Sequence, residues 1–176
     1  MNMNRPLDPP LDPPLDPPLD PPLDRAWIAA HIPHSGSMCL LDEVVRWDEE
    51  TIECVATSHC DPLNPLRRNG RLGAVCGAEY AAQAMAVHGA VLGAQSGRPR
   101  AGFLASVRGV EMHVERLDTF DAPLAVTADR ISGDADNILY RFTVRCGAQT
   151  LLEGRAAVIL DARTATAIPT ARSHDA

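Results

Sequence analysis

One long segment of the chain has the pattern of a helix that is buried on nearly every side. Between 75 and 92 the sequence reads VCGAEYAAQAMAVHGAVL, with apolar residues recurring at intervals of three and four, which favours a helix over a strand. Its many alanines and glycines leave little side-chain bulk, so a sheet can approach this helix closely. One carboxylate, Glu79, interrupts the run. An ionised glutamate is almost never fully buried alone, so Glu79 needs a partner, a cavity or a proton.

In the segments before and after this helix in the sequence, apolar and polar residues alternate, which predicts strands. Met38–Trp47 and Thr51–Ser58 are expected to form a hairpin around the acidic turn 48–50. Four further strands are expected after the helix, at about Gly102–Arg116, Leu124–Ser132, Ile138–Cys146 and Thr150–Leu160. The economical packing for this order is an α+β fold, in which an antiparallel sheet curls around the one long helix.

Proline content sets the beginning of the chain apart. Residues 7–22 are four copies of Leu-Asp-Pro-Pro, and neither helix nor sheet can use so many prolines. Residues 1–24 are therefore expected to form an extended arm that does not pack. We interpret the arm as an inert expansion, with a stiff spacer or a docking ligand for a partner as the alternatives.

A folded domain is expected to begin directly after this arm. Asp24 is the expected N-cap of a short helix, Arg25–His31, which Ile32–Pro33 would end. The domain is expected to cover 25–161, and 162–176 are expected to form a flexible tail.

Composition limits the classes of function. The chain has 176 residues, 45% of them hydrophobic, which is enough for one domain with a real core, and its net charge of −7 argues against a general nucleic-acid binder. No apolar run is long enough to span a membrane and no signal-peptide pattern begins the chain, so a cytoplasmic protein is expected. The five cysteines form no CxxC pair, which favours reduced, mostly buried thiols over disulfides or a zinc ribbon.

Three stretches carry a resemblance to a known family. They are Ile32-Pro33-His34 with Met38–Val44, then Val75–Gln83, where Glu79 and Gln83 form a Glu-x-x-x-Gln pattern, and Gly102–Val107. Over 26–161 the chain resembles the hotdog-fold β-hydroxyacyl-acyl-carrier-protein dehydratases. The segments IPHSGSMCLLD and CGAEYAAQAMAVHG resemble the dehydratase-like proteins found with aryl polyene pigment synthesis.

The resemblance implies a hotdog fold, a homodimer or a heteromer with another hotdog subunit, and a site between protomers. It implies the removal of water from a 3-hydroxyacyl thioester on acyl carrier protein to give the trans-2-enoyl thioester, without a metal or redox cofactor. Glu79 would be the acid for the departing hydroxyl. Backbone N–H groups near Ala74 and Val75 could hold the thioester oxygen, and Gln83 could orient the carboxyl.

The chain departs from the family pattern in the loop before the long helix. The usual position of the basic histidine falls on Asn64-Pro65-Leu66, so no histidine stands there. His59 lies in the same loop and is the candidate base, Asn64 could position a water, and His34 matches a family histidine that is not normally assigned as the base. A subunit that does not catalyse alone is a further alternative, and acyl thioester hydrolysis at Glu79 is another.

For several other polar residues, a purely structural role is weighed against a functional one. Arg67, Arg68 and Arg71 form either a solvated loop or a site for the phosphopantetheine phosphate and an acidic carrier protein. His88 projects to the helix face opposite Glu79, where a satisfied buried histidine is expected. A metal site at residues 59–61 is disfavoured, because three adjacent side chains converge poorly.

Overall fold

The computed structural model describes residues 22–95, 101–133 and 137–161. The expected tail, 162–176, and all but the last three residues of the expected arm lie outside the described residues. Two of those three, Leu23 and Asp24, form a short strand, β1, that the proline-rich pattern did not predict. Leu23 is buried there, so the packed domain begins slightly before residue 25.

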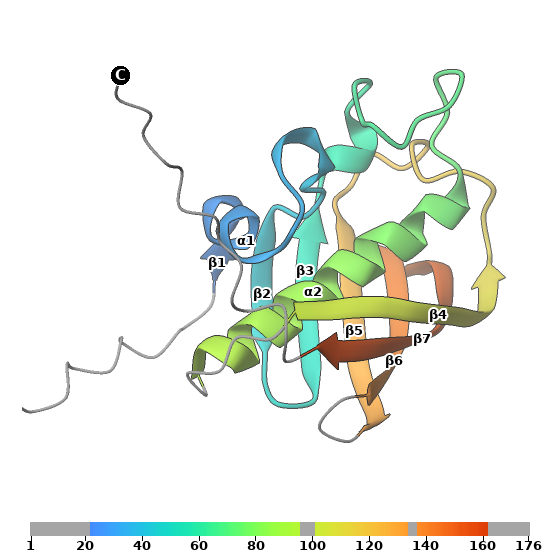
Figure 1. The fold of residues 1–176 in the computed structure, drawn as a ribbon. Coiled ribbons are helices and arrows are strands. Elements are labelled where there is room, and N and C mark those ends of the chain that lie inside the picture. The colour runs from blue at the N-terminus through green and yellow to red at the C-terminus, as the bar shows by residue number, and fades with distance from the viewer. Residues whose placement is uncertain (1–21, 96–100, 134–136, 162–176) are drawn as a thin grey trace, which may run out of the picture.

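The described chain forms one antiparallel sheet that curls around a long helix, α2, as Figure 1 shows. The sheet order is β1-β2-β3-β5-β6-β7-β4. The elements are β1 (Leu23–Asp24), α1 (Arg25–His31), β2 (Glu43–Trp47), β3 (Thr51–Ala56), α2 (Gly77–Gln95), β4 (Ala101–Met112), β5 (Leu124–Gly133), β6 (Asn137–Cys146) and β7 (Gln149–Asp161), with short 3-10 turns η1 (Gly36–Met38), η2 (Ser58–Cys60) and η3 (Ala74–Cys76). This is the hotdog fold, and it confirms the α+β architecture expected from the sequence.

The first helix and the first hairpin follow the local signals of the sequence. Asp24 caps α1, because its Oδ1 accepts a hydrogen bond from the Trp27 N–H at 2.8 Å, and Ile32 ends the helix in an extended conformation. In the turn between β2 and β3, Asp48 Oδ1 accepts from the N–H groups of Glu50 and Thr51. The predicted hairpin is therefore confirmed.

Two predicted strands are shorter than expected, because the backbone at their ends bonds elsewhere. The strand predicted from Met38 begins only at Glu43, since the Leu40 N–H donates to the side chain of Gln83 on α2. The strand predicted to reach Arg116 ends at Met112, and Glu115 O instead accepts from the Ala74 N–H. Both segments leave the sheet and approach helix α2.

Helix α2 is buried through small residues on its sheet-facing side, as its composition predicts. It begins two residues later than predicted, after η3, and continues to Gln95. Ala81 and Ala84 are fully buried, and a Cβ on Gly77 would collide with the Leu152 side chain of β7. The predicted apolar face of β6 is confirmed, because Tyr140 and Phe142 point inward and are buried against this core.

His88 connects the far half of α2 to the sheet. Its Nε2–H donates to Asp48 O at 2.8 Å, and its Nδ1 accepts from the Tyr140 hydroxyl at 3.1 Å. Both ring nitrogens therefore have partners while the ring is neutral and fully buried, which confirms the expected satisfied histidine.

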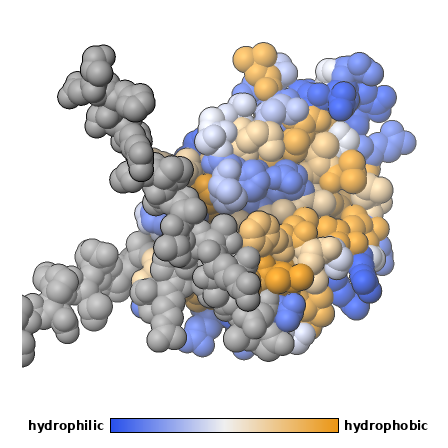
Figure 2. Space-filling model, in the orientation of Figure 1, coloured by the Kyte–Doolittle hydropathy of each residue, from blue (hydrophilic) through white to orange (hydrophobic). Residues whose placement is uncertain are grey.

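The two edges of the sheet differ in length and in surface. β1 has two residues, whereas β4 has 12 and carries exposed apolar side chains, among them Phe103, Leu104 and Met112. Figure 2 shows apolar surface over the region of β4. An exposed, apolar edge strand of this length is a site at which another chain can extend the sheet.

Among the described residues, no helix is long and apolar enough to cross a membrane. All five cysteines are free thiols. Only Cys39 and Cys54 are buried, so the expectation that the thiols are mostly buried is wrong.

Candidate functional site

Glu79 lies in the first turn of α2, and its side chain is 33% exposed. The helix places it beside the segment that enters β2, because that segment bonds to α2 one turn further on. The carboxyl group is thus neither fully buried nor free in water. Its Oε1 has two nitrogen neighbours, the side chains of Gln83 and His34.

Gln83 links this carboxyl group to the backbone that precedes β2. Its Oε1 accepts from the Leu40 N–H at 2.9 Å, and its Nε2 donates to Met38 O at 2.8 Å and to Glu79 Oε1 at 3.2 Å. The Leu40 N–H can only donate and Met38 O can only accept, so the orientation of the Gln83 amide is fixed. Gln83 is fully buried, and every polar group of its side chain has a partner.

His34 is the histidine that the structure brings to Glu79. Its Nε2 lies 3.2 Å from Glu79 Oε1, whereas its Nδ1 is buried without a hydrogen-bond partner among the described residues. The residue stands in the irregular segment between α1 and η1. A carboxylate and an imidazole in direct contact form a pair that can hold and transfer protons.

His59, the candidate base from the sequence, has different contacts. It is buried in η2, and its Nε2 lies 3.0 Å from Phe120 O and 3.3 Å from Cys60 Sγ. Burial lowers the pKa of this ring, because the charged form loses its hydration. Its hydrogen bonds among the described residues go to the 120 segment and to Cys60, and the structure does not bring it to Glu79.

Asn64 holds the loop before α2 in place. Its Nδ2 donates to Ser58 O at 2.8 Å and to the Tyr80 hydroxyl at 2.9 Å, while its Oδ1 accepts from the Leu66 N–H. The Ser58 hydroxyl also forms a hydrogen bond with the Tyr80 hydroxyl, at 2.9 Å. Burial raises the pKa of Tyr80, so its hydroxyl keeps its proton for these bonds. The amide of Asn64 is therefore occupied by protein groups.

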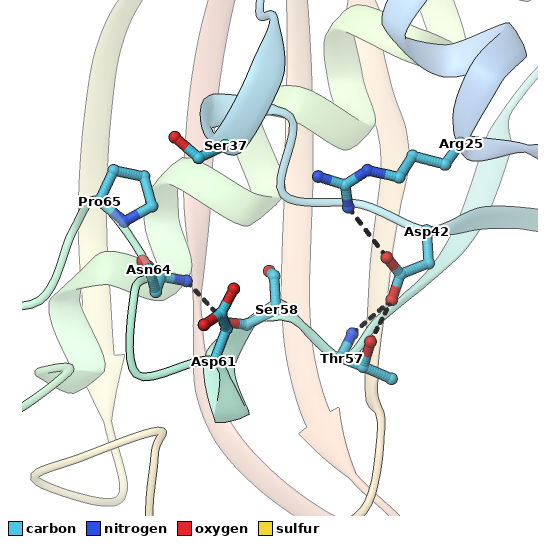
Figure 3. A pocket seen from close by; sticks show the side chains of 8 residues that line it. All are labelled: Arg25, Ser37, Asp42, Thr57, Ser58, Asp61, Asn64 and Pro65. Carbon is cyan, nitrogen blue, oxygen red and sulfur yellow. Dashed lines mark hydrogen bonds and ion pairs between the residues drawn. The ribbon is translucent and has the colours of Figure 1, made fainter.

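A polar pocket of about 250 Å³ lies beside this network, as Figure 3 shows. Its walls come from α1, η1, the start of β2 and the loop after β3, and they consist of Arg25, Ser37, Asp42, Thr57, Ser58, Asp61, Asn64 and Pro65. Asp42 joins these elements, because it accepts from Arg25 and from both the N–H and the hydroxyl of Thr57. Glu79 does not line this pocket, whereas Asn64 does.

The three loop arginines do not have the same role. Arg67 is mostly buried, and its guanidinium bonds to Asp118 at 2.8 Å and to three backbone carbonyls. A hydrogen bond from Arg116 holds the pKa of the Asp118 carboxyl well below its usual range. Arg67 is thus part of the loop structure, whereas Arg68 and Arg71 are exposed.

The backbone amides at the start of the helix are only partly available. The Ala74 N–H already donates to Glu115 O at 2.9 Å, so it cannot also hold a substrate oxygen. Val75, whose side chain is exposed, is the remaining candidate of the expected pair.

Among the described residues, three side chains lie close enough together to be considered as ligands of one metal ion. Potential ligand atoms of Glu111, His113 and Glu153 lie within 4.8 Å of one another on the outer side of β4 and β7. These side chains are exposed or half-buried, and His113 and Glu153 already form an ion pair at 3.0 Å. Exposed carboxylates often gather in this way without an ion, so the group supports no assignment.

His34 is the site residue that the sequence argument did not select. Two signals could have found it: Glu79 required a partner, and His34 follows an Ile-Pro dipeptide just before the buried segment 39–41. The two residues lie 45 positions apart in the chain, so no local pattern contains their contact.

Comparisons with known proteins identify the family and the fold of the chain. A family model described as ApeP-like, ApeP dehydratase, matches residues 26–168. Among curated proteins, no sequence matches the chain. One similar solved structure is the dehydratase heterocomplex ApeI:P from Xenorhabdus doucetiae, with 22% identity, a TM-score of 0.69 and coverage of 78% of this chain and 92% of that one.

Two other solved structures share the fold at lower similarity. A mutant of the thioesterase SAV0944 from Staphylococcus aureus has 10% identity, a TM-score of 0.50 and coverage of 66% of this chain and 90% of that one. The PaaI protein of the E. coli phenylacetic acid degradation operon has 12% identity, a TM-score of 0.50 and coverage of 66% and 80%.

Proposed function

Because the chain belongs to the ApeP-like dehydratase family, we propose that it removes water from 3-hydroxyacyl thioesters carried on acyl carrier protein, as one subunit of a hotdog heteromer. The observation that carries the proposal is Glu79, a half-buried carboxyl on α2 that accepts a hydrogen bond from Gln83 and lies 3.2 Å from His34 Nε2. The product would be the trans-2-enoyl thioester.

The reaction needs two proton transfers. The C2–H bond breaks and its electron pair forms the C2=C3 double bond, while the C3–O bond breaks and the hydroxyl leaves as water after it receives a proton. Glu79 is the proposed acid for this hydroxyl. The thioester oxygen gains negative charge as C2 loses its proton, and the Val75 N–H is the proposed donor to it.

An enzyme that acts alone needs a base for the C2 proton as well as the acid Glu79. The base is the group for which the described residues of this chain offer no good candidate. His59 is occupied at Phe120 O and buried, so it is a poor candidate for a base at Glu79. We therefore propose that the base comes from a second hotdog subunit. The long apolar edge strand β4 supports this assembly, and the similar ApeI:P dehydratase is a heterocomplex.

Thioester hydrolysis is the second candidate function. Glu79 is partly exposed, so it could activate a water molecule for attack on a thioester carbonyl. The fold is shared with a thioesterase from Staphylococcus aureus, but at 10% identity that likeness concerns the fold alone.

Mass spectrometry of the carrier-bound product separates these functions. The chain is incubated with a 3-hydroxyacyl carrier protein, alone and together with a co-encoded hotdog subunit. We expect loss of water from the carrier-bound chain in the mixture, whereas release of the free acid would favour a thioesterase. Glu79→Gln should lower the rate by at least about 100-fold, as loss of an acid–base group does. Full activity of this variant would refute the assignment of Glu79.

A further inference from the structure

We propose that His34 is a positioning residue of this site: together with Gln83 it holds Oε1 of Glu79, and this leaves Oε2 as the oxygen that exchanges the proton with the substrate. The inference rests on the proposed function, in which Glu79 reacts. It assigns a role to a histidine of this chain itself, which is distinct from any base that a second subunit supplies.

The first step is to establish that Gln83 donates a hydrogen bond to Glu79 Oε1 rather than accepting one from it. The Gln83 amide is fixed by Leu40 and Met38, so one of its N–H groups points at Glu79 Oε1 and donates to it. Glu79 Oε1 is therefore an acceptor in this contact.

The second step is the protonation of the His34 ring. Its Nε2 faces the same Oε1 atom at 3.2 Å, and its Nδ1 is buried without a partner among the described residues. A buried N–H without an acceptor costs more than a buried nitrogen lone pair, so the hydrogen belongs on Nε2. His34 then presents its N–H beside Oε1 in an ion-pair contact of 3.2 Å, next to the hydrogen bond from Gln83.

The third step concerns the other oxygen. Oε1 accepts a hydrogen bond from Gln83 and lies 3.2 Å from His34 Nε2, whereas the structure gives Oε2 no hydrogen bond or ion pair among the described residues. The side chain is 33% exposed, so Oε2 is the oxygen that a substrate can reach. The Gln83 hydrogen bond and the His34 contact together restrict the direction of the carboxyl group, and a carboxyl that rotates freely would lose reactive geometry.

The inference predicts a distinctive pattern among variants of His34. The amide nitrogen of Gln lies the same number of bonds from Cα as His Nε2, whereas the amide nitrogen of Asn matches Nδ1. His34→Gln can therefore donate to Glu79 Oε1, and His34→Asn cannot. His34→Ala and His34→Asn should lower kcat by about 10- to 100-fold with KM within about twofold, the scale of a misplaced reacting group.

The experiment measures dehydration of a 3-hydroxyacyl carrier protein by the full chain with its hotdog partner. We expect His34→Gln to recover most of the kcat that Ala and Asn lose. His31→Ala is the matched control, because His31 lies in α1 and its Nδ1 contacts Trp27 O. Unchanged kcat in His34→Ala, an effect on KM alone, or a Gln variant as slow as the Ala variant would each overturn the inference.

A measurement without turnover tests the same geometry. In ¹⁵N spectra of the full chain, the His34 ring should carry its hydrogen on Nε2, and Glu79→Gln should shift that resonance while the His31 resonances stay in place. A His34 ring with its hydrogen on Nδ1 would overturn the inference even if a variant failed to fold. If wild-type protein shows no dehydration with its partner, the proposed function fails, and the spectra still decide the contact.

Discussion

Burial of His88 makes the stability of the fold depend on pH. Burial lowers the pKa of this ring, and Arg130 adds to the effect, while the hydrogen bond to Asp48 O and the charge of Asp48 oppose it. The unfolded chain therefore binds a proton at a higher pH than the folded one. The stability that neutral His88 contributes is complete above the unfolded pKa of about 6.5 and is lost as the pH falls below it.

Urea denaturation at about pH 7.5 and about pH 5.5 measures this dependence. The free energy of unfolding of the wild type should fall between the two, and the fall should be smaller in His88→Gln, which cannot titrate but can still donate to Asp48 O. His59, whose pKa burial also lowers, should account for part of the remaining fall. An equal fall in both proteins would contradict the assignment to His88.

Arg68 and Arg71 are the exposed arginines before α2, and we expect them to contact the carrier protein or its phosphate. Replacing both by Ser should raise KM for a carrier-bound substrate by about 10-fold, the effect of losing about 1.4 kcal/mol of binding. KM for a small thioester that lacks the phosphate should not change. Arg46→Ser on β2, which removes an equally exposed arginine, is the control. Equal effects on both substrates would exclude a carrier contact.

For single residues, the sequence indicates that Glu79 needs a partner but does not identify that partner. Burial of a carboxylate on an apolar helix is a local signal, so Glu79 and its i+4 neighbour Gln83 could be selected from one sequence. His34 and the involvement of Arg67 with Asp118 depend on contacts between distant segments, which local patterns do not contain.

At the scale of elements, the approach of α2 to β7 depends on one glycine. A Cβ on Gly77 would collide with Leu152, so Gly77→Ala should destabilise the protein by about 1–3 kcal/mol, as overpacked cores do. Gly89→Ala is the matched control in the same helix, because a Cβ there would meet nothing within 4 Å. That change should be neutral or stabilise by up to about 1 kcal/mol. Thermal or urea unfolding of both variants measures the difference, and equal midpoints would contradict it.

Elements with strong local signals were predicted nearly to the residue. Asp24 and Ile32–Pro33 delimit α1 by a cap and a proline, and the alternation in β6 identifies its buried face. β1 was missed, because Leu23–Asp24 continues a repeat that otherwise excludes strands. The order of strands in the sheet was not predictable from local patterns. β3 pairs with β5, although α2 and β4 lie between these two strands in the sequence.

For the whole molecule, the apolar edge of β4 is the proposed interface with a second subunit. Phe103 and Leu104 are exposed apolar residues there, and replacing Phe103 by Asp would place a charge in the interface. Light scattering after size-exclusion chromatography should show loss of the complex with a co-expressed hotdog partner. Ile131→Asp on β5 changes a similarly exposed apolar residue away from this edge and should leave the complex intact. Equal behaviour of the two variants would place the interface elsewhere.

The pairing of β4 with β7 has a consequence for biosynthesis. β4 leaves the ribosome directly after α2, but its neighbour in the sheet is β7, which comes last among the described strands. Strands β5 and β6, which pack against the apolar helix, also emerge later. Nascent chain that has reached β6 therefore still presents bare apolar surface, which is the state that chaperones recognise. β7, translated after the other described strands, then pairs on both of its sides, with β6 and with β4.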